Sequence, residues 1–236
     1  RLVIDVRWAT HGKLAMDSRE VALSAAFNVR DLGGLPAGDG WRVRRGRAYR
    51  ADALHRLTPP DRAVMAGLGI RRVFDLRSEA ELARDGIGEF AGRVAEHVHV
   101  PLVRVSLSPF DPDIDWKTVN LRDRYLEMLH EGGAAIRAVF SALAADTFDA
   151  VVFHCSGGKD RTGVVAALVL RSLGVADATI VEDYALSEVN LAEAVREAAL
   201  VVLAVPSHGV RDVVAAAAPF LHPGAVLLSA AKGIEE

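Results

Sequence analysis

The stretch 151–163, with the sequence VVFHCSGGKDRTG, constrains this chain more than any other part of it. Its apolar start predicts a buried strand, its glycines predict a tight loop, and the residues that follow begin a helix. Cys155 is the only cysteine of the chain and stands at the start of the loop, and Arg161 follows six positions later. The sequence therefore predicts a strand, a loop and a helix N-terminus that bring a thiol close to a guanidinium.

A loop that leads into a helix is suited to binding a tetrahedral anion. The free N–H groups and the positive dipole end of the helix favour a phosphate dianion. The same field favours a thiolate over a thiol, so we expect Cys155 to be a nucleophile and Arg161 to grip two phosphate oxygens. The residues expected to bind the substrate are Ser156, Gly157, Gly158, Lys159, Asp160 and Thr162.

Other kinds of site fit the loop less well. A nucleotide-binding loop needs a glycine at 153 and a serine or threonine at 160, where this chain has Phe153 and Asp160. A single cysteine cannot form a disulfide within the chain, and His154 beside Cys155 lacks companion ligands at zinc spacing. No metal or cofactor is therefore expected.

The pattern His-Cys-x5-Arg-Thr at 154–162 resembles the signature of the protein tyrosine phosphatase superfamily. Its longer form, His-Cys-x-x-Gly-Lys-Asp-Arg-Thr-Gly, is similar to a bacterial branch of tyrosine and dual-specificity phosphatases that also act on phosphoinositides. Two more segments match this branch, FNVRDLGG at 27–34 and VFDLRS at 73–78, so the resemblance spans about residues 27–190. It implies a cysteine-dependent phosphomonoester hydrolase for phosphotyrosine proteins, and also for phosphoserine or phosphothreonine. Phosphoinositides are the alternative substrate.

Two aspartates are candidates for the general acid. Asp75 follows a predicted strand at 71–74 as Cys155 follows its own, and the carboxyl ends of parallel strands meet at one edge of a sheet. We therefore expect Asp75 to lie near Cys155 and to protonate the leaving oxygen, with a loop-stabilising role as the alternative. Asp160 ranks second. An acidic loop, more simply interpreted as solvated, holds the remaining candidates Asp111, Asp113 and Asp115.

Several polar residues near these motifs have simpler structural interpretations. We expect Arg30 and Asp31 to form an ion pair that fixes a loop near the active site, and His97 and His99 to face solvent. Thr162 either donates a hydrogen bond to the thiolate or merely caps the helix.

The periodicity of the whole chain predicts an α/β fold with a central, mostly parallel sheet flanked by helices and the phosphate loop between a strand and a helix. Thr58 and Ser78 are expected to cap helices at 59–68 and 79–84. The other predicted strands are 2–6, 46–52 and 97–102, and the other predicted helices lie near 121–129, 136–143 and 162–173.

The character of the sequence changes near residue 190, which predicts a phosphatase domain at 1–190 and an α/β extension at 191–236. AVPS at 204–207 and KGIE at 232–235 resemble an interior fragment of NAD(P)-dependent glycerol-3-phosphate dehydrogenase, and this resemblance implies that Lys232 lies near a substrate. The glycine-rich dinucleotide fingerprint is absent from the chain. We expect a fusion or fragment without activity of its own, and a divergent phosphatase C-terminus is the alternative.

Composition narrows the class of protein further. Hydrophobic residues make up 51% of the 236 residues, enough for a substantial core, and the net charge of −3 does not indicate a nucleic-acid partner. No apolar run approaches membrane-spanning length, so no integral membrane segment is expected. One cysteine fits a cytoplasmic location, or export without a signal visible in this sequence. The partner is expected to be a phosphorylated protein or a phosphoinositide, and the oligomeric state is left open.

Overall fold

The computed structural model describes residues 4–5, 19–93, 96–103, 120–145, 149–196, 200–203, 214–215 and 217–229. The strands are β1 (Ile4–Asp5), β2 (Arg30–Asp31), β3 (Arg42–Val43), β4 (Ala48–Ala51), β5 (Ile70–Asp75), β6 (Glu96–His99), β7 (Ala150–His154), β8 (Leu200–Leu203) and β9 (Val226–Ser229). The α-helices are α1 (Pro59–Gly67), α2 (Glu79–Asp85), α3 (Gly88–Ala91), α4 (Leu121–Glu131), α5 (Gly133–Ala144), α6 (Asp160–Ser172) and α7 (Asp177–Arg196). Short 3-10 helices are η1 (Gly38–Gly40), η2 (Leu54–Arg56) and η4 (Ala218–Phe220). The predicted acidic loop with Asp111, Asp113 and Asp115 lies outside the described residues, as does Lys232.

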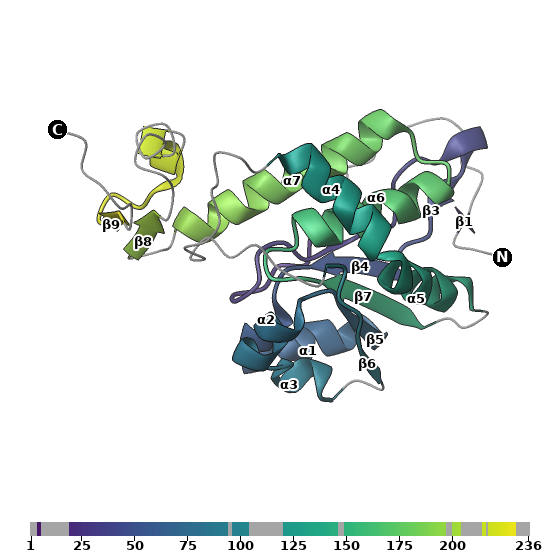
Figure 1. Cartoon of the computed structure of the whole chain (residues 1–236), viewed down its shortest axis with the longest axis horizontal. Coiled ribbons are helices and arrows are strands. Elements are labelled where there is room, and N and C mark those ends of the chain that lie inside the picture. The colour runs from purple at the N-terminus through teal and green to yellow at the C-terminus, as the bar shows by residue number, and fades with distance from the viewer. Residues whose placement is uncertain are drawn as a thin grey trace.

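A five-stranded sheet forms the centre of the molecule, in the order β2-β4-β7-β5-β6 (Figure 1). Strands β4, β7, β5 and β6 are parallel, and only β2 at one edge runs antiparallel to its neighbour β4. All five residues of β7 are buried, which is typical of a parallel strand that helices cover on both faces. The predicted α/β fold with a mostly parallel central sheet is therefore confirmed.

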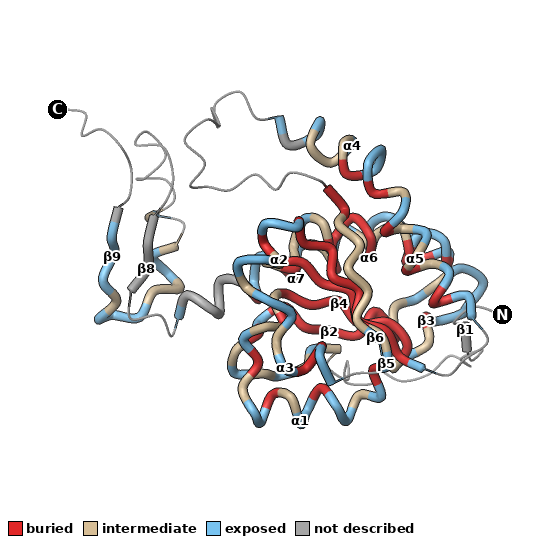
Figure 2. The backbone as a smooth tube through the Cα atoms, turned by 60° about the horizontal axis from the view of Figure 1, so that its bottom comes forward, coloured by how far each residue is buried: buried red, intermediate tan, exposed pale blue. Residues whose placement is uncertain are grey.

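Helices cover the two faces of this sheet, with α1, α2 and α3 on one side and α4, α5, α6 and α7 on the other (Figure 1). Alternate residues of β7 serve the two faces: Val151 and Phe153 pack in the core cluster on the α5–α6 side, and Val152 packs in the opposite cluster. Each such apolar side chain stabilises the fold by about 1.5–3 kcal/mol when it is fully buried. Figure 2 shows that the buried residues concentrate along these central strands.

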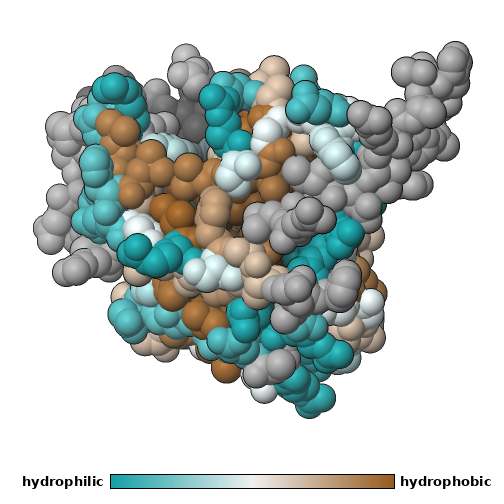
Figure 3. Space-filling view, turned by 90° about the vertical axis from the view of Figure 1, so that its right-hand side faces the viewer, coloured by the Kyte–Doolittle hydropathy of each residue, from teal (hydrophilic) through white to brown (hydrophobic). Residues whose placement is uncertain are grey.

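Apolar residues also reach the surface in places. Figure 3 shows apolar side chains gathered in the middle of the face that lies on the right of Figure 1, with hydrophilic side chains around them. No helix within the described part of the chain is long and apolar enough to cross a membrane.

The predicted helix starts are confirmed in detail. Thr58 accepts a hydrogen bond from the Asp61 N–H, and Ser78 accepts one from the Glu81 N–H, and both helices carry a complete capping box. Helix α6 begins at Asp160, two residues before the predicted start, and an acidic residue there is favoured by the helix dipole. These caps fix where the loops at the edge of the sheet turn into helices.

The carboxyl ends of the parallel strands meet at one edge, as the sequence predicts. Asp75 at the end of β5 is paired in register with His154 at the end of β7, and His154 is also paired with Ala51 of β4. Cys155 follows His154 directly, so the loop 155–161, called the cysteine loop below, starts beside Asp75.

The C-terminal strands form a sheet of their own. Helix α7 runs without interruption across the predicted boundary at 190, and β8 and β9 then pair in parallel as a two-stranded sheet. The Arg196 guanidinium lies 5.6 Å from the centre of the Phe220 ring, which links the end of α7 to η4. The extension thus contains both helical and strand elements, while its resemblance to a dehydrogenase fragment stays a prediction.

Candidate active site

The thiol of Cys155 lies inside the molecule at the start of the cysteine loop. Only 2% of this residue is exposed. The Thr162 hydroxyl, in the first turn of α6, donates a hydrogen bond to the Cys155 sulfur at 3.1 Å. Of the two predicted roles of Thr162, the hydrogen bond to sulfur is the one that the structure contains.

The cysteine loop packs tightly against the end of β4. Gly158 has a φ of +64°, and a Cβ atom there would lie 2.6 Å from the carbonyl oxygen of Ala51. Only glycine combines this left-handed conformation with such a close backbone approach. The glycine at this position is therefore required by the path of the loop.

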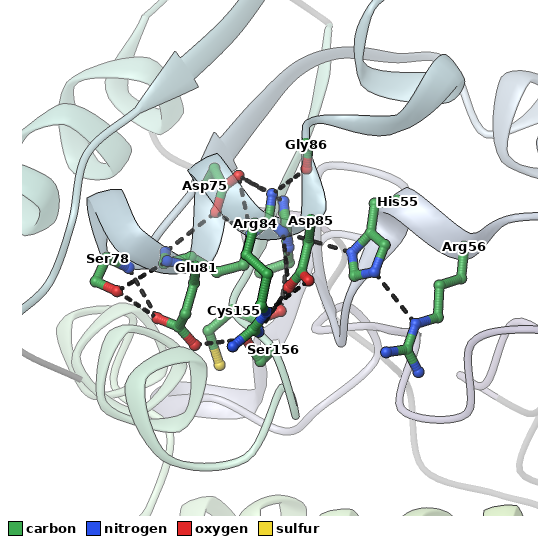
Figure 4. A network of polar contacts seen from close by, with 12 residues as sticks. His55, Arg56, Asp75, Ser78, Glu81, Arg84, Asp85, Gly86, Cys155 and Ser156 are labelled. Carbon is green, nitrogen blue, oxygen red and sulfur yellow. Dashed lines mark hydrogen bonds and ion pairs between the residues drawn. The ribbon is translucent and has the colours of Figure 1, made fainter. Parts of the chain in front are cut away.

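Arg161 is held by a carboxylate that the sequence analysis did not identify. Its Nη1 and Nη2 atoms donate to Glu81 Oε2 at 2.5 Å and to Oε1 at 2.9 Å. The Ser156 hydroxyl donates to Glu81 Oε1 at 2.6 Å, so Glu81 joins the two ends of the cysteine loop. Figure 4 shows the Glu81 carboxylate close to Ser78 and Ser156, with Cys155 beside them.

Glu81 and Arg161 each stabilise the charged form of the other. Burial alone would raise the pKa of Glu81, but the hydrogen bonds from Arg161 and Ser156 outweigh it and hold that pKa below its ordinary value. Burial alone would lower the pKa of Arg161, but the hydrogen bonds to Glu81 raise it. The Ser78-x-x-Glu81 capping spacing was the one sequence signal that could have drawn attention to Glu81.

Asp75 occupies a different environment from the one predicted for a general acid. None of its side chain is exposed, and Arg77 donates from Nε to Oδ1 at 2.9 Å and from Nη2 to Oδ2 at 2.6 Å. Burial alone would raise the pKa of Asp75, but the hydrogen bonds from Arg77 lower it to about 2. A buried carboxylate that stays ionised has no proton to donate at neutral pH. This geometry speaks against the predicted proton-transfer role and favours the loop-stabilising alternative.

The histidines at this edge belong to the same buried group. His154 Nε2 lies 3.7 Å from Asp75 Oδ2, and burial lowers the pKa of His154 to about 4, so it is neutral at pH 7. The side chains of His97 and His99 are only 16% and 18% exposed, and the prediction that they face solvent is wrong. They turn inward because Asp75 and the Arg77 carbonyl lie within reach, at 3.5 Å from His97 and 2.9 Å from His99. Within the described residues, no group of His, Cys, Asp and Glu side chains is arranged to hold a metal ion.

Asp160 is exposed and is bound by two tyrosines from the helices above the loop. Its Oδ1 atom accepts a hydrogen bond from the Tyr125 hydroxyl of α4 and another from the Tyr184 hydroxyl of α7, the latter at 3.2 Å. The two hydroxyl oxygens lie 2.7 Å apart. Burial, followed by the hydrogen bond to Asp160, raises the pKa of Tyr125. Neither tyrosine was a candidate site residue from the sequence, where Tyr125 falls within the predicted helix near 121–129.

Lys159 lies at the exposed rim of the same loop. Its ammonium group donates to Glu188 Oε1 of α7 at 2.9 Å, and 30% of the lysine side chain remains exposed. An ion pair this exposed contributes little to stability, so a competing anion can displace Glu188 at low energetic cost.

The predicted ion pair between Arg30 and Asp31 is wrong. Arg30 pairs with Asp183 of α7, at 3.3 Å, whereas Asp31 accepts hydrogen bonds from the N–H groups of Gly33 and Gly46, both at 2.8 Å. The reason is the strand geometry, because successive residues of β2 point to opposite faces of the sheet. Arg30 is nevertheless close to the cysteine loop, as predicted, through its hydrogen bond to Asn28.

A cavity of about 410 Å³ lies between α1, α3 and the amino end of β5. Its lining residues are Pro59, Arg62, Ala63, Ala66, Ile70, Arg71, Phe90 and Arg93. Because Cys155 follows the carboxyl end of the parallel strand β7, this cavity belongs to the opposite edge of the sheet and not to the cysteine loop.

Comparison with known proteins agrees with the geometry of the cysteine loop. A tyrosine-protein phosphatase of Nostoc commune is 33% identical over 187 residues, which cover 70% of this chain and 61% of that protein. A putative tyrosine-protein phosphatase of Cupriavidus necator is 32% identical over 170 residues, covering 70% and 62%. A triple specificity protein phosphatase of Mycobacterium tuberculosis is 34% identical over 194 residues, covering 69% and 67%. The chain thus spans about three fifths of the length of the first two relatives.

The sequence pattern of the whole family covers most of the chain. It matches residues 21–225, which include the cysteine loop, the segments at 27–34 and 73–78, and most of the C-terminal extension. The predicted family is confirmed, and the chain belongs to the tyrosine phosphatase family.

Proposed function

We propose that this protein hydrolyses phosphotyrosine in protein substrates through a phosphocysteine intermediate. The observation that supports this most directly is the hydrogen bond from Thr162 to the sulfur of Cys155 in a loop that opens helix α6 and ends on Arg161. Such a loop presents N–H donors and a guanidinium to a phosphoryl group while it keeps the nucleophile within reach of phosphorus.

In the first step the Cys155 sulfur attacks phosphorus. An S–P bond forms, the P–O bond to the tyrosine breaks, and the phenolate oxygen takes a proton. The charge on the phosphoryl oxygens is stabilised by Arg161 and by the backbone N–H groups of Ser156, Gly157, Gly158 and Lys159.

In the second step water attacks phosphorus, the S–P bond breaks, and phosphate and the thiolate are released. The Thr162 hydroxyl stabilises the departing thiolate. We assign both proton transfers to Asp160, which gives a proton to the phenolate and takes one from water, because it is exposed and belongs to the loop itself. Asp75 has no exposed surface, and both of its oxygens are occupied by the guanidinium of Arg77.

The test is hydrolysis of a phosphotyrosine peptide, with a phosphoserine peptide in parallel and EDTA present. Cys155→Ser should abolish turnover while it retains binding of the peptide, and acid-quenched wild-type enzyme should carry a phosphoryl group on Cys155. Turnover by Cys155→Ser, or complete loss of the wild-type rate in EDTA, contradicts the proposal.

Phosphoinositides are the second candidate substrate, and the exposed ammonium of Lys159 favours them. Within the part of the chain that the structure describes, Glu188 is the partner of this group at the rim of the loop, where a second phosphate of a polyanionic headgroup can replace the carboxylate. If so, Lys159→Gln should lower the rate on a phosphoinositide panel several-fold more than the rate on the phosphotyrosine peptide. Equal effects on both substrates would leave the peptide as the preferred class.

A further inference from the structure

Three consecutive carbonyl groups of the cysteine loop are tied to the surrounding scaffold. The Ser156 carbonyl accepts a hydrogen bond from the Ala53 N–H at 3.0 Å, and the Gly157 carbonyl accepts one from Asn28 Nδ2 at 3.1 Å. The Gly158 carbonyl accepts one from Arg50 Nη2 at 2.8 Å. Each donor comes from β4, from the residue directly before η2, or from the residues before β2, all outside the loop.

These ties set the direction of the N–H groups as well. In a trans peptide unit the C=O and N–H groups point to opposite sides. Once the carbonyls of 156, 157 and 158 are drawn outward, the N–H groups of Gly157, Gly158 and Lys159 must point the other way. Among the described residues no acceptor is found for these three N–H groups, so they are available to an anion.

The Asn28 amide is locked in the orientation that donates to the loop. Its Oδ1 atom accepts a hydrogen bond from Arg30 Nη1, and its backbone N–H is held by Asp52 Oδ1 at 3.2 Å. Because the oxygen side of the amide is occupied by a donor, the Nδ2 group has to face the Gly157 carbonyl. Asn28 is completely buried, so water does not compete for this bond.

The Arg50 side chain is also held in one orientation. Only 1% of it is exposed, and its Nη1 atom donates to Asp183 Oδ2 at 2.8 Å while Nη2 reaches the Gly158 carbonyl. Burial lowers the pKa of Arg50 to about 10, so it is still a cation at neutral pH. A buried ion pair such as Arg50–Asp183 does not by itself show a gain in stability. The contact of Arg50 with the Gly158 carbonyl therefore says more about the role of this arginine than the ion pair does.

We propose that Asn28 and Arg50 are positioning residues that aim the N–H groups of the cysteine loop at the phosphoryl site. This inference rests on the proposed function in one respect, namely that the loop binds a phosphoryl group. Neither side chain touches the substrate, and both act by holding a carbonyl away from the anion that its neighbouring N–H group binds.

The experiment compares Asn28→Asp and Arg50→Lys with the matched control Arg19→Lys. Asn28→Asp keeps the shape of the side chain but removes the donor to the Gly157 carbonyl. Arg50→Lys keeps the positive charge but removes the guanidinium, whose two terminal nitrogens bind Asp183 and the Gly158 carbonyl at the same time. Arg19 also pairs with Asp183, at 2.8 Å, and donates its other hydrogen bond to the Asp31 carbonyl, outside the loop. Arg19→Lys therefore disturbs the same group of ion pairs but leaves the hydrogen bonds to the loop carbonyls in place.

The readouts are the affinity for orthovanadate by titration calorimetry, the pH midpoint of Cys155 alkylation by iodoacetamide, and kcat and KM. We expect Asn28→Asp and Arg50→Lys each to bind vanadate about ten-fold more weakly, since a hydrogen bond that orients a charge-binding donor is lost. The alkylation midpoint should rise in both variants, and Arg19→Lys should resemble the wild type even if its Tm falls.

Wild-type vanadate affinity in both Asn28→Asp and Arg50→Lys would overturn the inference, and so would an equal loss of affinity in Arg19→Lys. Should Arg50→Lys fail to fold, Asn28→Ala decides the matter, because it removes the donor to the Gly157 carbonyl without adding a carboxylate and leaves the Arg50–Asp183 pair intact. If the wild type binds vanadate but hydrolyses no phosphomonoester, the proposed function fails, whereas the vanadate titration still tests the positioning role.

Discussion

Asp75 and Asp160 lie at the same edge of the sheet, but their surroundings differ in almost every respect. Asp75 is wholly buried and both of its oxygens accept hydrogen bonds from the guanidinium of Arg77. Asp160 is exposed, and two tyrosine hydroxyls bind only its Oδ1 atom. A place at the end of a strand therefore does not by itself decide whether a carboxylate serves the structure or moves protons.

The chemistry of the partners explains the difference. A guanidinium is a permanent cation, so it stabilises only the ionised form of Asp75 and prevents proton exchange at neutral pH. Tyrosine hydroxyls are neutral, and at Asp160 they orient the carboxylate through one of its two oxygens. Among the described residues no partner is found for the second oxygen of Asp160, so this oxygen is open to a bound substrate.

The largest change in kcat is expected from a substitution of Asp160. We expect Asp160→Asn to lower kcat by about 10²–10⁴-fold for a phosphotyrosine peptide, because the leaving oxygen loses its proton donor. Aryl phosphates with an acidic leaving group should be much less affected, because they need no protonation. An unchanged kcat on both kinds of substrate would remove Asp160 from the mechanism.

Asp75→Asn should act on stability instead. It leaves the Arg77 guanidinium buried without its counter-ion, so the free energy of unfolding should fall by about 3–5 kcal/mol in urea titration. The kcat of the folded fraction should stay near the wild-type value. The double variant Asp75→Asn/Arg77→Met should recover part of the loss, since it buries no unpaired charge. A large fall in kcat at wild-type stability would return Asp75 to the role of general acid.

The pH dependence of stability sharpens the same contrast. Folded His154 has a pKa of about 4, below its ordinary value, so the unfolded chain takes up this proton first as the pH falls. Stability should therefore decrease between about pH 6.5 and pH 4, by about 3 kcal/mol in total from this group. The pKa of about 2 of Asp75 adds a further loss below about pH 4.

Urea unfolding at a series of pH values between 7 and 3 measures this slope. His154→Gln should flatten the upper part of the curve and leave the loss below pH 4 in place. A wild-type curve that is level from pH 6.5 to 4 would show that His154 is not buried in its neutral form.

The smallest expected effect belongs to the tyrosines that hold Asp160. Tyr125→Phe and Tyr184→Phe should each lower kcat by about 2–10-fold, the value of one ordinary hydrogen bond, and shift the pH profile of kcat. Tyr49→Phe, which removes the hydroxyl of a buried tyrosine of β4, is the matched control and should leave the profile unchanged. In an Asp160→Asn background the effect of Tyr184→Phe should vanish, because the two residues act as one unit. Additive losses of kcat in the double variant would show instead that Tyr184 and Asp160 act independently.

The sequence predicted those parts of the site that lie within one contiguous motif. Cys155, Arg161 and Thr162 are fixed relative to one another by a strand, a loop and a helix start, each with its own local signal. Glu81, Asn28 and Arg50 come from three other parts of the chain, namely α2, the residues before β2, and β4. Their contacts with the loop depend on how the chain packs.

The burial of Asp75 was hidden for a similar reason. Its environment depends on Arg77, which turns back onto it from only two residues away, and on histidines of two neighbouring strands. Hydrophobic periodicity reports which face of a strand is buried, but it does not say which charges are buried together there. The fold was easier to predict, because the buried strand β7 and the capped helices α1 and α2 each carry a local signal.

Helix α7 faces the cysteine loop with four residues, and the last three of them lie one, four and five positions after the first. Asp183 and Ser187 bind Arg50, Tyr184 binds Asp160, and Glu188 binds Lys159. All four bonds are made together in only one rotational setting of the helix. One residue inserted between 177 and 183 would turn this face by about 100° and move every one of these groups away from the loop.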